Sequence, residues 1–146
     1  MPLSQVDECG FCRIICRAAP ARIVYEADNA VAFLPLAPAV PGHTLVVPKI
    51  HIRDIWALKE SEAQSLATST LAVCWAVRRA LMPDGLNVIN SNGQAATQTV
   101  NHLHVHVVPR WTGDAFGKIW PDSPVMSESE KDEIASLIRG AIAHNE

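Results

Sequence analysis

The sequence predicts an α+β fold with a mostly antiparallel sheet, and three observations support this. Short apolar or β-branched runs follow one another with only hairpin turns or loops between them. One long helical stripe interrupts these runs near the middle of the chain. The length of 146 residues, with 49% hydrophobic and 18% charged residues, fits a single globular domain. Strands that are joined without regular crossover helices pair antiparallel, with the helices packed beside the sheet.

The first half of the chain predicts a short helix, a hairpin and a third strand. The turn signal Ala27-Asp28-Asn29 separates the two strands of the hairpin. Three prolines between the hairpin and the third strand exclude a paired strand there and predict a loop. The expected elements are a helix over 9–17, which Pro20 ends, strands over 22–26, 30–34 and 43–48, and the loop over 34–42.

The second half predicts the long helix, two more strands and a final helix. An apolar stripe between residues 54 and 81 indicates the long helix, with Ser61 as its expected cap. Ser127 and Glu130 form a capping box for the last helix. The expected elements are strands over 86–90 and 100–108, a polar loop over 91–99, an end to the fifth strand at Pro109, an irregular segment over 110–125 and a helix over 128–143.

Charge and hydropathy exclude several classes of protein. The net charge of −3 and the pI near 6.0 lack the basic surface of a nucleic-acid binder. No run approaches 18 uninterrupted apolar residues, so no membrane span is expected. The segment from Met1 to Gly10 carries Asp7 and Glu8 and no apolar core, which argues against a secretory signal. A cytoplasmic protein is therefore expected.

Three histidines at spacing two, His102, His104 and His106, make the segment before Pro109 rich in chemistry. On a strand they share one face, while the aliphatic residues between them face the core. Three interpretations are open: solvent-exposed histidines, a metal site, or one nucleophilic imidazole with hydrogen-bonding neighbours. A single metal ion on all three is disfavoured, because the positions spread over about 13 Å of strand.

This segment resembles the signature of the histidine-triad (HIT) family. The resemblance extends to Tyr25–Leu34, which is similar to the first hairpin of the family, and to Pro41–Lys49 with His51, which is similar to its central strand. Gln98-Thr99-Val100 precedes the triad as it does in the family. The resemblance implies a HIT-like fold with about five strands and one HIT domain over 1–146, with a triad core at about 9–109 and a variable segment at 110–146.

The resemblance also implies roles for single residues. His104 corresponds to the nucleophile that attacks the α-phosphorus of a nucleotide conjugate, and His106 to the residue that contacts the phosphate and the leaving group. A neighbouring backbone carbonyl would fix the tautomer of His104. Gln98 corresponds to a side chain that hydrogen-bonds the phosphate or the bridging oxygen. The implied nucleotide-binding residues are Phe33, Leu36 and Ile14 around the base, for which core packing is the alternative, with Ser91 and Asn92 in the phosphate loop.

Three positions depart from the family pattern. Thr97 stands where a glycine usually precedes the glutamine. Pro35 stands near the position of an acidic or amide residue that binds the ribose hydroxyls, and a proline side chain cannot make that contact. Ser91, with Asn92 beside it, aligns with an asparagine at the start of the phosphate loop. His43 is expected to hydrogen-bond within the sheet or to lie near the phosphate.

The pair Cys9 and Cys12 is a CxxC motif, for which metal binding and inert thiols are both open. A redox role would need a thioredoxin-like βαβ context, which the predicted elements lack. In a branch of the HIT family such a pair holds zinc with two histidines, and His51 and His102 match their positions. Two cysteines and two histidines form a closed tetrahedral set, so structural zinc is expected, with none needed for the chemical step. Cys16 is expected to be a buried free thiol, and Cys74, in the apolar stripe of the long helix, is expected to lie in the core.

The expected function is a nucleotide hydrolase or transferase that acts on phosphoramidates or dinucleoside polyphosphates of a purine nucleoside monophosphate. The alternative is a nucleotide-binding regulator with little turnover. The resemblance further implies a homodimer, and no nucleic acid or membrane is expected as a partner. The segment from Trp111 to Pro121 is rich in aromatic residues, and Trp120 is expected either to shape the leaving-group side of the pocket or to pack at the dimer interface.

Overall fold

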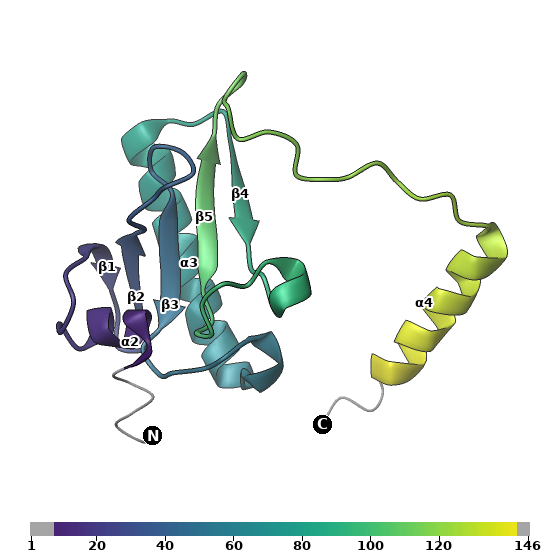
Figure 1. Cartoon of the computed structure of the whole chain (residues 1–146), viewed down its shortest axis with the longest axis horizontal. Coiled ribbons are helices and arrows are strands. Elements are labelled where there is room, and N and C mark those ends of the chain that lie inside the picture. Colours follow the sequence, from purple (N-terminus) through teal and green to yellow (C-terminus); the bar gives the residue numbers. More distant parts are fainter. Residues whose placement is uncertain (1–7, 143–146) are drawn as a thin grey trace. The chain divides into compact units, whose positions relative to one another are not determined.

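The computed structural model describes residues 8–142. They form two compact units, and the boundary along the chain lies between Phe116 and Gly117. The first unit contains a five-stranded antiparallel sheet with the strand order β1-β2-β3-β5-β4 (Figure 1). The predicted α+β fold with an antiparallel sheet is confirmed. Its elements are α2 (Gly10–Ile15), β1 (Arg22–Glu26), β2 (Ala30–Leu34), β3 (Thr44–Pro48), the 3₁₀ turn η1 (Ile55–Ala57), α3 (Glu60–Leu81), β4 (Gly85–Ile89), the 3₁₀ turn η2 (Gln94–Ala96) and β5 (Val105–Arg110).

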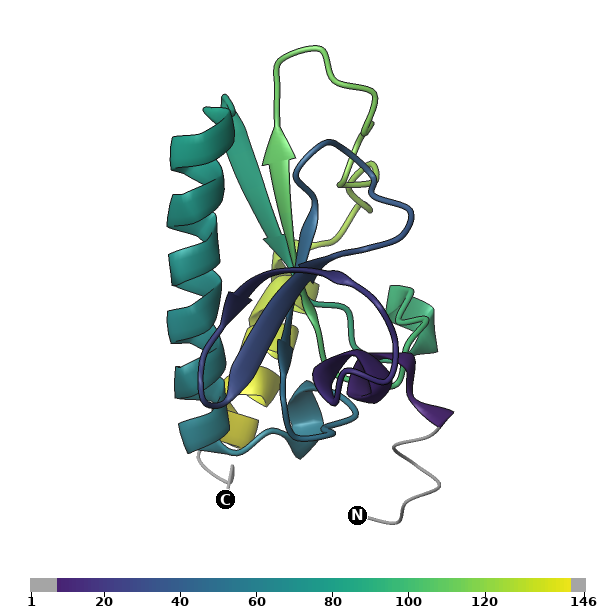
Figure 2. The same ribbon diagram turned by 90° about the vertical axis from the view of Figure 1, so that its left-hand side faces the viewer.

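The sheet has an apolar layer on each face, because alternate residues of β2 and β3 point to opposite sides. The long helix α3 lies along one face and α2 along the other (Figure 2). Under α3 the main buried residues are Ala32, Val46, Leu66, Val73, Val77, Leu103, Val105 and Val107. Under α2 they are Val31, Phe33, Leu45 and Val47, with Phe11, Ile14 and Ile15 of the helix packed on them.

The fifth strand begins later than the alternation of histidines and aliphatics predicts. It starts at Val105, so His106 lies on the strand while His102 and His104 precede it. The prediction of three histidines on one strand is therefore wrong. The reason is a pair of long-range bonds: the Leu103 amide donates to the Ile52 carbonyl at 2.6 Å, and the His102 ring donates to the Pro48 carbonyl. These bonds tie the segment to the chain that follows β3 without forming a regular ladder.

Two predicted element ends also differ from the structure. The helix α3 begins at Glu60, and the carboxylate of Glu62 accepts from the backbone N–H of Lys59 at 2.8 Å, so Lys59 and not Ser61 caps it. Pro109 does not end β5, which continues to Arg110. A proline is tolerated there because the pairing of β5 with β3 reaches only to Val107, where Thr44 is the partner.

Gly42 brings the loop after β2 close to the end of α3. Its φ of +87° lies in the left-handed region that favours glycine. A Cβ atom at this position would lie 2.3 Å from Cδ1 of Leu81 and 3.1 Å from Cγ of Pro109. The chain therefore needs glycine here, immediately before His43.

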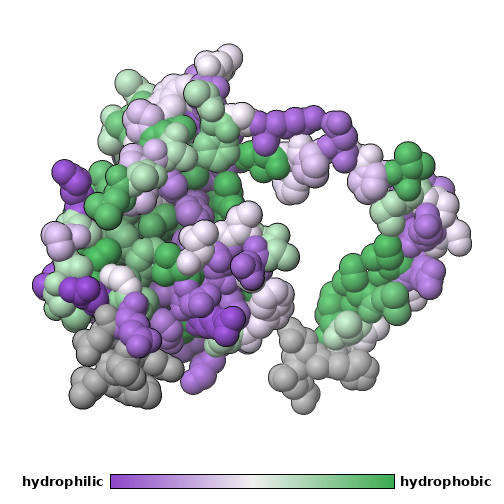
Figure 3. Space-filling view, in the orientation of Figure 1, coloured by the Kyte–Doolittle hydropathy of each residue, from purple (hydrophilic) through white to green (hydrophobic). Residues whose placement is uncertain are grey.

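The second unit contains α4 (Glu128–Ile142). The predicted capping box is present, since the Ser127 hydroxyl accepts from the Glu130 amide and the Glu130 carboxylate accepts from the Ser127 amide. Ala143, the predicted last residue of this helix, lies outside the described residues, as do Met1 to Asp7. Figure 3 shows hydrophobic surface along one side of α4. Its exposed large apolar residues are Ile134, Leu137, Ile138 and Ile142. Among residues 8–142, no helix combines the length and the hydropathy of a membrane span.

Candidate functional site

Four side chains from distant parts of the chain meet beside α2. They are Cys9, Cys12, His51 and His102, and their ligand atoms all lie within 4.8 Å of one another. The Sγ of Cys9 lies 3.4 Å from Nδ1 of His102, and the Sγ of Cys12 lies 3.3 Å from Nδ1 of His51. In tetrahedral zinc sites with typical bond lengths, sulfur and nitrogen ligands lie about 3.5 Å apart. The four residues therefore have the composition and the spacing to hold a metal ion.

The protonation of this cluster also suits a metal. Nε2 of His102 donates to the Pro48 carbonyl at 2.9 Å, so Nδ1 keeps its lone pair and faces the two sulfurs. Burial lowers the pKa of His102 to about 4, which keeps the ring neutral. Burial also raises the pKa of the Cys12 thiol to about 12. A divalent cation would offset the cost of the buried thiolate.

His104 lies next to this cluster, and its ring is held by the backbone. Its Nδ1 lies 2.7 Å from the carbonyl oxygen of His102. A carbonyl can only accept, so Nδ1 carries the proton and Nε2 of the neutral ring keeps its lone pair. The Asn90 amide donates to the carbonyl of His104 itself at 2.9 Å, which fixes the backbone at this residue. Asn90 was not among the predicted site residues, although it directly precedes the predicted Ser91.

His106 is oriented from the other side by His43. The backbone N–H of Ala39 donates to Nδ1 of His43 at 3.0 Å, so the proton of the neutral His43 ring is on Nε2. This Nε2 lies 2.9 Å from Nδ1 of His106. The bond leaves Nε2–H of a neutral His106 as a free donor. The rings of His104 and His106 are 4.9 Å apart, so a free lone pair and a free donor stand side by side.

Burial and the neighbouring rings favour the neutral forms of His43 and His106. Burial, followed by repulsion from His104 and His43, lowers the pKa of His106 to about 4. Burial and repulsion from His104 also lower the pKa of His43. Neutral imidazoles can act as nucleophiles and as directional hydrogen-bond donors, whereas imidazolium rings lack the free lone pair.

The predicted phosphate loop is held by the side chains of Gln98 and Asn92. Gln98 is buried, its Oε1 accepts from the Gly93 amide, and its Nε2 donates to the carbonyls of Arg53 and Val100. Both N–H groups of the Gln98 amide are therefore engaged within the protein. Asn92 accepts from the Ile55 amide at 2.8 Å. A contact of the Gln98 amide with phosphate would require one of these bonds to be exchanged.

Thr97 lies in this loop with a φ of +69°, in the left-handed region. This conformation explains why a glycine suits the position. A β-branched residue in it is strained, so the loop retains the conformation at a cost of about 1–2 kcal/mol.

The predicted base-binding residues lie on α2, near the end of β2 and in the loop that follows β2. Phe33 is buried, Ile14 is half-buried, and Leu36 is 95% exposed. Phe33 and Ile14 belong to one apolar cluster, whereas Leu36 projects from the proline-rich loop. Phe11 also belongs to this cluster, and its ring contacts both Phe33 and His104. Phe11 was not among the predicted site residues, although its position between Cys9 and Cys12 placed it beside the predicted metal ligands.

The fold and the arrangement of histidines define a histidine-triad protein, and the comparisons agree. Residues 17–113 match the HIT domain family. The chain is 38% identical over 115 residues to "Protein hit" of Bacillus subtilis, covering 78% of this chain and 79% of that protein. It is 33% identical to the adenosine 5'-monophosphoramidase hnt1 of Schizosaccharomyces pombe, covering 90% of this chain and 98% of that protein. The chain therefore belongs to the HIT family.

A solved structure supports the same conclusion. The chain is similar to a zinc-bound histidine triad family protein from Mycobacterium smegmatis, with a TM-score of 0.73 and 35% identity. The match covers 94% of this chain and 99% of that protein. The resemblance to the HIT family and the HIT-like fold are thus confirmed.

Proposed function

We propose that this protein is a nucleotide hydrolase or transferase that acts on the α-phosphate of nucleoside monophosphate conjugates. The observation that carries the proposal is the bond between Nδ1 of His104 and the His102 carbonyl, which directs the lone pair of Nε2 outward from a fixed ring. His104 is the proposed nucleophile. His106, with its free Nε2–H beside it, is the proposed donor to the leaving group.

The reaction has two steps. In the first, Nε2 of His104 forms a bond to the α-phosphorus while the bond from phosphorus to the leaving group breaks. Nε2–H of His106 donates a hydrogen bond to the departing group, which takes its proton from solvent. In the second, water attacks phosphorus, the phosphorus–nitrogen bond breaks, and the proton lost by water returns to solvent. His104 returns to its starting form, and the nucleoside monophosphate leaves. The lone pair on Nε2 of His104 and the Nε2–H of His106 are the groups that these steps use.

The proposed substrates are phosphoramidates or dinucleoside polyphosphates of a purine nucleoside. The relative from Schizosaccharomyces pombe, an adenosine 5'-monophosphoramidase, supports the phosphoramidate class. An amine departs poorly as an anion, so a hydrogen bond from Nε2–H of His106 matters most for that leaving group. Phe33, Leu36 and Ile14 are proposed to contact the base, and Gln98, Ser91 and Asn92 to shape the phosphate loop.

Zinc is the proposed metal at Cys9, Cys12, His51 and His102. The closed Cys₂His₂ set supports a structural role, because no ligand position is left for substrate. When bound, zinc would join α2 to the segment that carries the triad. The proposed chemistry itself runs on His104 and His106.

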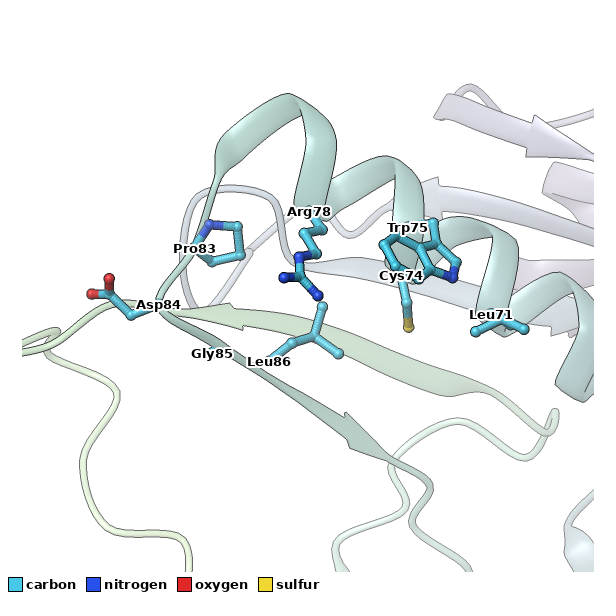
Figure 4. A pocket seen from close by; sticks show the side chains of 8 residues that line it. All are labelled: Leu71, Cys74, Trp75, Arg78, Pro83, Asp84, Gly85 and Leu86. Carbon is cyan, nitrogen blue, oxygen red and sulfur yellow. The ribbon is translucent and has the colours of Figure 1, made fainter.

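A cytoplasmic homodimer is the proposed form of the protein. Leu71, Cys74, Trp75 and Leu86 line an apolar groove between α3 and β4 (Figure 4). Trp75 is 46% exposed, and β4 is an edge strand of the described sheet. A two-fold axis beside β4 would cover the groove with a second copy of the chain and would pair the exposed edge.

The segment from Trp111 to Pro121 is proposed to influence the choice of leaving group. Trp120 is 79% exposed within the second unit, so its ring is available to a ligand or to a partner subunit. A Trp120→Ala variant should change the ranking of substrates by leaving group and preserve the acceptance of different bases. An unchanged ranking would favour the alternative, which is packing at the dimer interface.

The decisive experiment detects the covalent intermediate. The protein is mixed with adenosine 5'-phosphoramidate, quenched in alkali because phosphohistidine is acid-labile, and analysed by mass spectrometry after digestion. An adenylyl mass increment on the peptide that carries His104, absent from a folded His104→Asn variant, is the expected result. AMP binding without any increment or product would instead identify the protein as a nucleotide-binding regulator with little turnover.

A further inference from the structure

The ring of Phe11 lies between the proposed metal site and the proposed nucleophile. Its centroid is 5.2 Å from that of His104 at an interplanar angle of 84°, and 5.8 Å from that of His102 at 71°. Both are edge-on contacts, the favourable geometry for aromatic rings. Phe11 also meets Phe33 at 5.4 Å. One side chain thus contacts a predicted metal ligand, the predicted nucleophile and a predicted base-binding residue.

The position of Phe11 in the chain gives these contacts a common cause. Phe11 is the second of the two residues between Cys9 and Cys12, so a metal ion bound to both sulfurs constrains the backbone on either side of it. The helix α2 has only six residues, and a helix of that length has little stability of its own. Its position therefore depends on the metal ligands and on the apolar contacts of Phe11, Ile14 and Ile15.

We propose that Phe11 is a positioning residue through which the bound metal holds the ring of His104. The inference rests on the proposed role of His104 as nucleophile, and it adds a function for the CxxC motif. Zinc fixes α2, α2 presents the edge of Phe11, and Phe11 limits rotation of the His104 ring away from its bond to the His102 carbonyl. Metal occupancy and nucleophile orientation are then coupled without any metal contact to the substrate.

The bond from Nδ1 of His104 to the His102 carbonyl gives a direct measure of this coupling. Rotation of the ring breaks the bond and exposes the Nδ1 proton to solvent, so its exchange rate by NMR reports how firmly the ring is held. Phe11→Leu keeps an apolar side chain but removes the aromatic edge. Ile15→Val is the matched control, because Ile15 packs on the same cluster from α2 and has no aromatic ring to offer His104.

In the zinc-loaded protein, Phe11→Leu should raise the exchange rate of the His104 Nδ1 proton roughly 2- to 10-fold. This is the factor that corresponds to the stabilisation lost with one aromatic pair. Ile15→Val should leave the rate unchanged. The tetrahedral absorption of the Co²⁺-substituted protein should be the same in both variants, which shows that the metal site is intact. Equal exchange rates in the two variants would overturn the proposal.

Removal of the metal is a second, independent test of the coupling. Chelation should accelerate exchange at His104 in the unmodified protein but add little in the Phe11→Leu variant, because both changes remove the same restraint. Additive effects would contradict the coupling. Neither measurement depends on turnover. A failure to form the covalent intermediate, with this exchange pattern intact, would refute the proposed function alone.

Discussion

Nε2 of His43 lies 2.9 Å from Nδ1 of His106, and the bond joins the start of β3 to the neighbouring strand β5. His43 directly precedes β3, and His106 lies on β5, where it pairs with Leu45. Because the Ala39 amide donates to Nδ1 of His43, the His43 proton is on Nε2. His43 then donates to Nδ1 of His106, so the His106 proton is on Nε2 as well. A backbone amide in the loop after β2 therefore determines which nitrogen of His106 can donate.

His43 is accordingly expected to be a positioning residue. His43→Ala should lower kcat for phosphoramidates by about 10-fold, because it removes the bond that directs the Nε2–H of His106 toward the leaving group, and a hydrogen bond to a charged group contributes about 1.5–3 kcal/mol. Substrates whose leaving group needs no protonation, such as a fluoridate, should be nearly unaffected. His43→Gln, which keeps a donor, should restore part of the rate. The same loss for all leaving groups would show that the change acts on the fold and not on proton donation.

The low pKa of His106 predicts a loss of stability in mild acid. The unfolded ring binds a proton below about pH 6.5. The folded ring does so only near pH 4, chiefly because of burial. The unfolded state therefore holds more protons between these values, and the free energy of unfolding should fall as pH decreases from 6.5 to 4. Denaturant titrations should show a weaker fall in His106→Asn, and identical pH profiles would contradict the assignment.

Metal content can be tested with two cysteines of different environment. The purified protein should carry about one equivalent of zinc per chain. Cys12→Ser should lower the free energy of unfolding by several kcal/mol, because metal binding and folding are coupled. Cys16→Ser is the control, since Cys16 lies outside the cluster and is exposed, so the prediction that this thiol is buried is wrong. Equal stabilities of the two variants would argue against a structural metal.

Strain in the phosphate loop predicts a stabilising substitution. Thr97→Gly should raise the free energy of unfolding by about 1 kcal/mol, because relief of the left-handed strain exceeds the added entropy of the unfolded chain. Thr99→Gly is the matched control, since Thr99 does not have a positive φ and should lose stability. Chemical denaturation of both variants measures the difference. Destabilisation by Thr97→Gly would show that the threonine side chain contributes more than its backbone costs.

The proposed dimer can be tested through the groove between α3 and β4. Trp75→Glu places a charge among Leu71 and Leu86 and should give a monomer by analytical ultracentrifugation at micromolar concentration. Trp56→Glu is the control, because Trp56 is even more exposed, at 78%, and does not line this groove. A monomeric unmodified protein would refute the dimer, and two dimeric variants would place the interface elsewhere.

Patterns within short stretches predicted most of the fold. Apolar and β-branched runs on either side of the turn at Ala27-Asp28-Asn29 located the strands of the hairpin, and Ser127 with Glu130 located the start of α4. The start of the fifth strand was missed because long-range bonds from Pro48 and Ile52 decide it, and no local pattern contains them. The start of α3 was missed for another reason. Its bond is local, from the Lys59 amide to Glu62, but lysine is not among the residue types that usually cap a helix.

The candidate site shows the same division. The cysteine pair and two distant histidines were assembled by resemblance, and the structure brings all four together. The bonds of His43 to His106 and of Asn90 to the backbone of His104 join separate elements, so the sequence alone could not assign them. Phe11 was overlooked because an aromatic residue on a short helix ordinarily indicates core packing, and its contact with His104 exists only in the folded chain.

Gly42 limits how the loop after β2 can be rebuilt. The proline-rich part of the loop carries Leu36 on its exposed surface, so an exchange there meets little of the rest of the protein. The far end of the loop has no such freedom, since a Cβ atom at position 42 would meet Leu81 and Pro109 in a left-handed conformation that suits glycine. A loop grafted from a relative would therefore have to keep this glycine, which directly precedes His43 and its bond to His106.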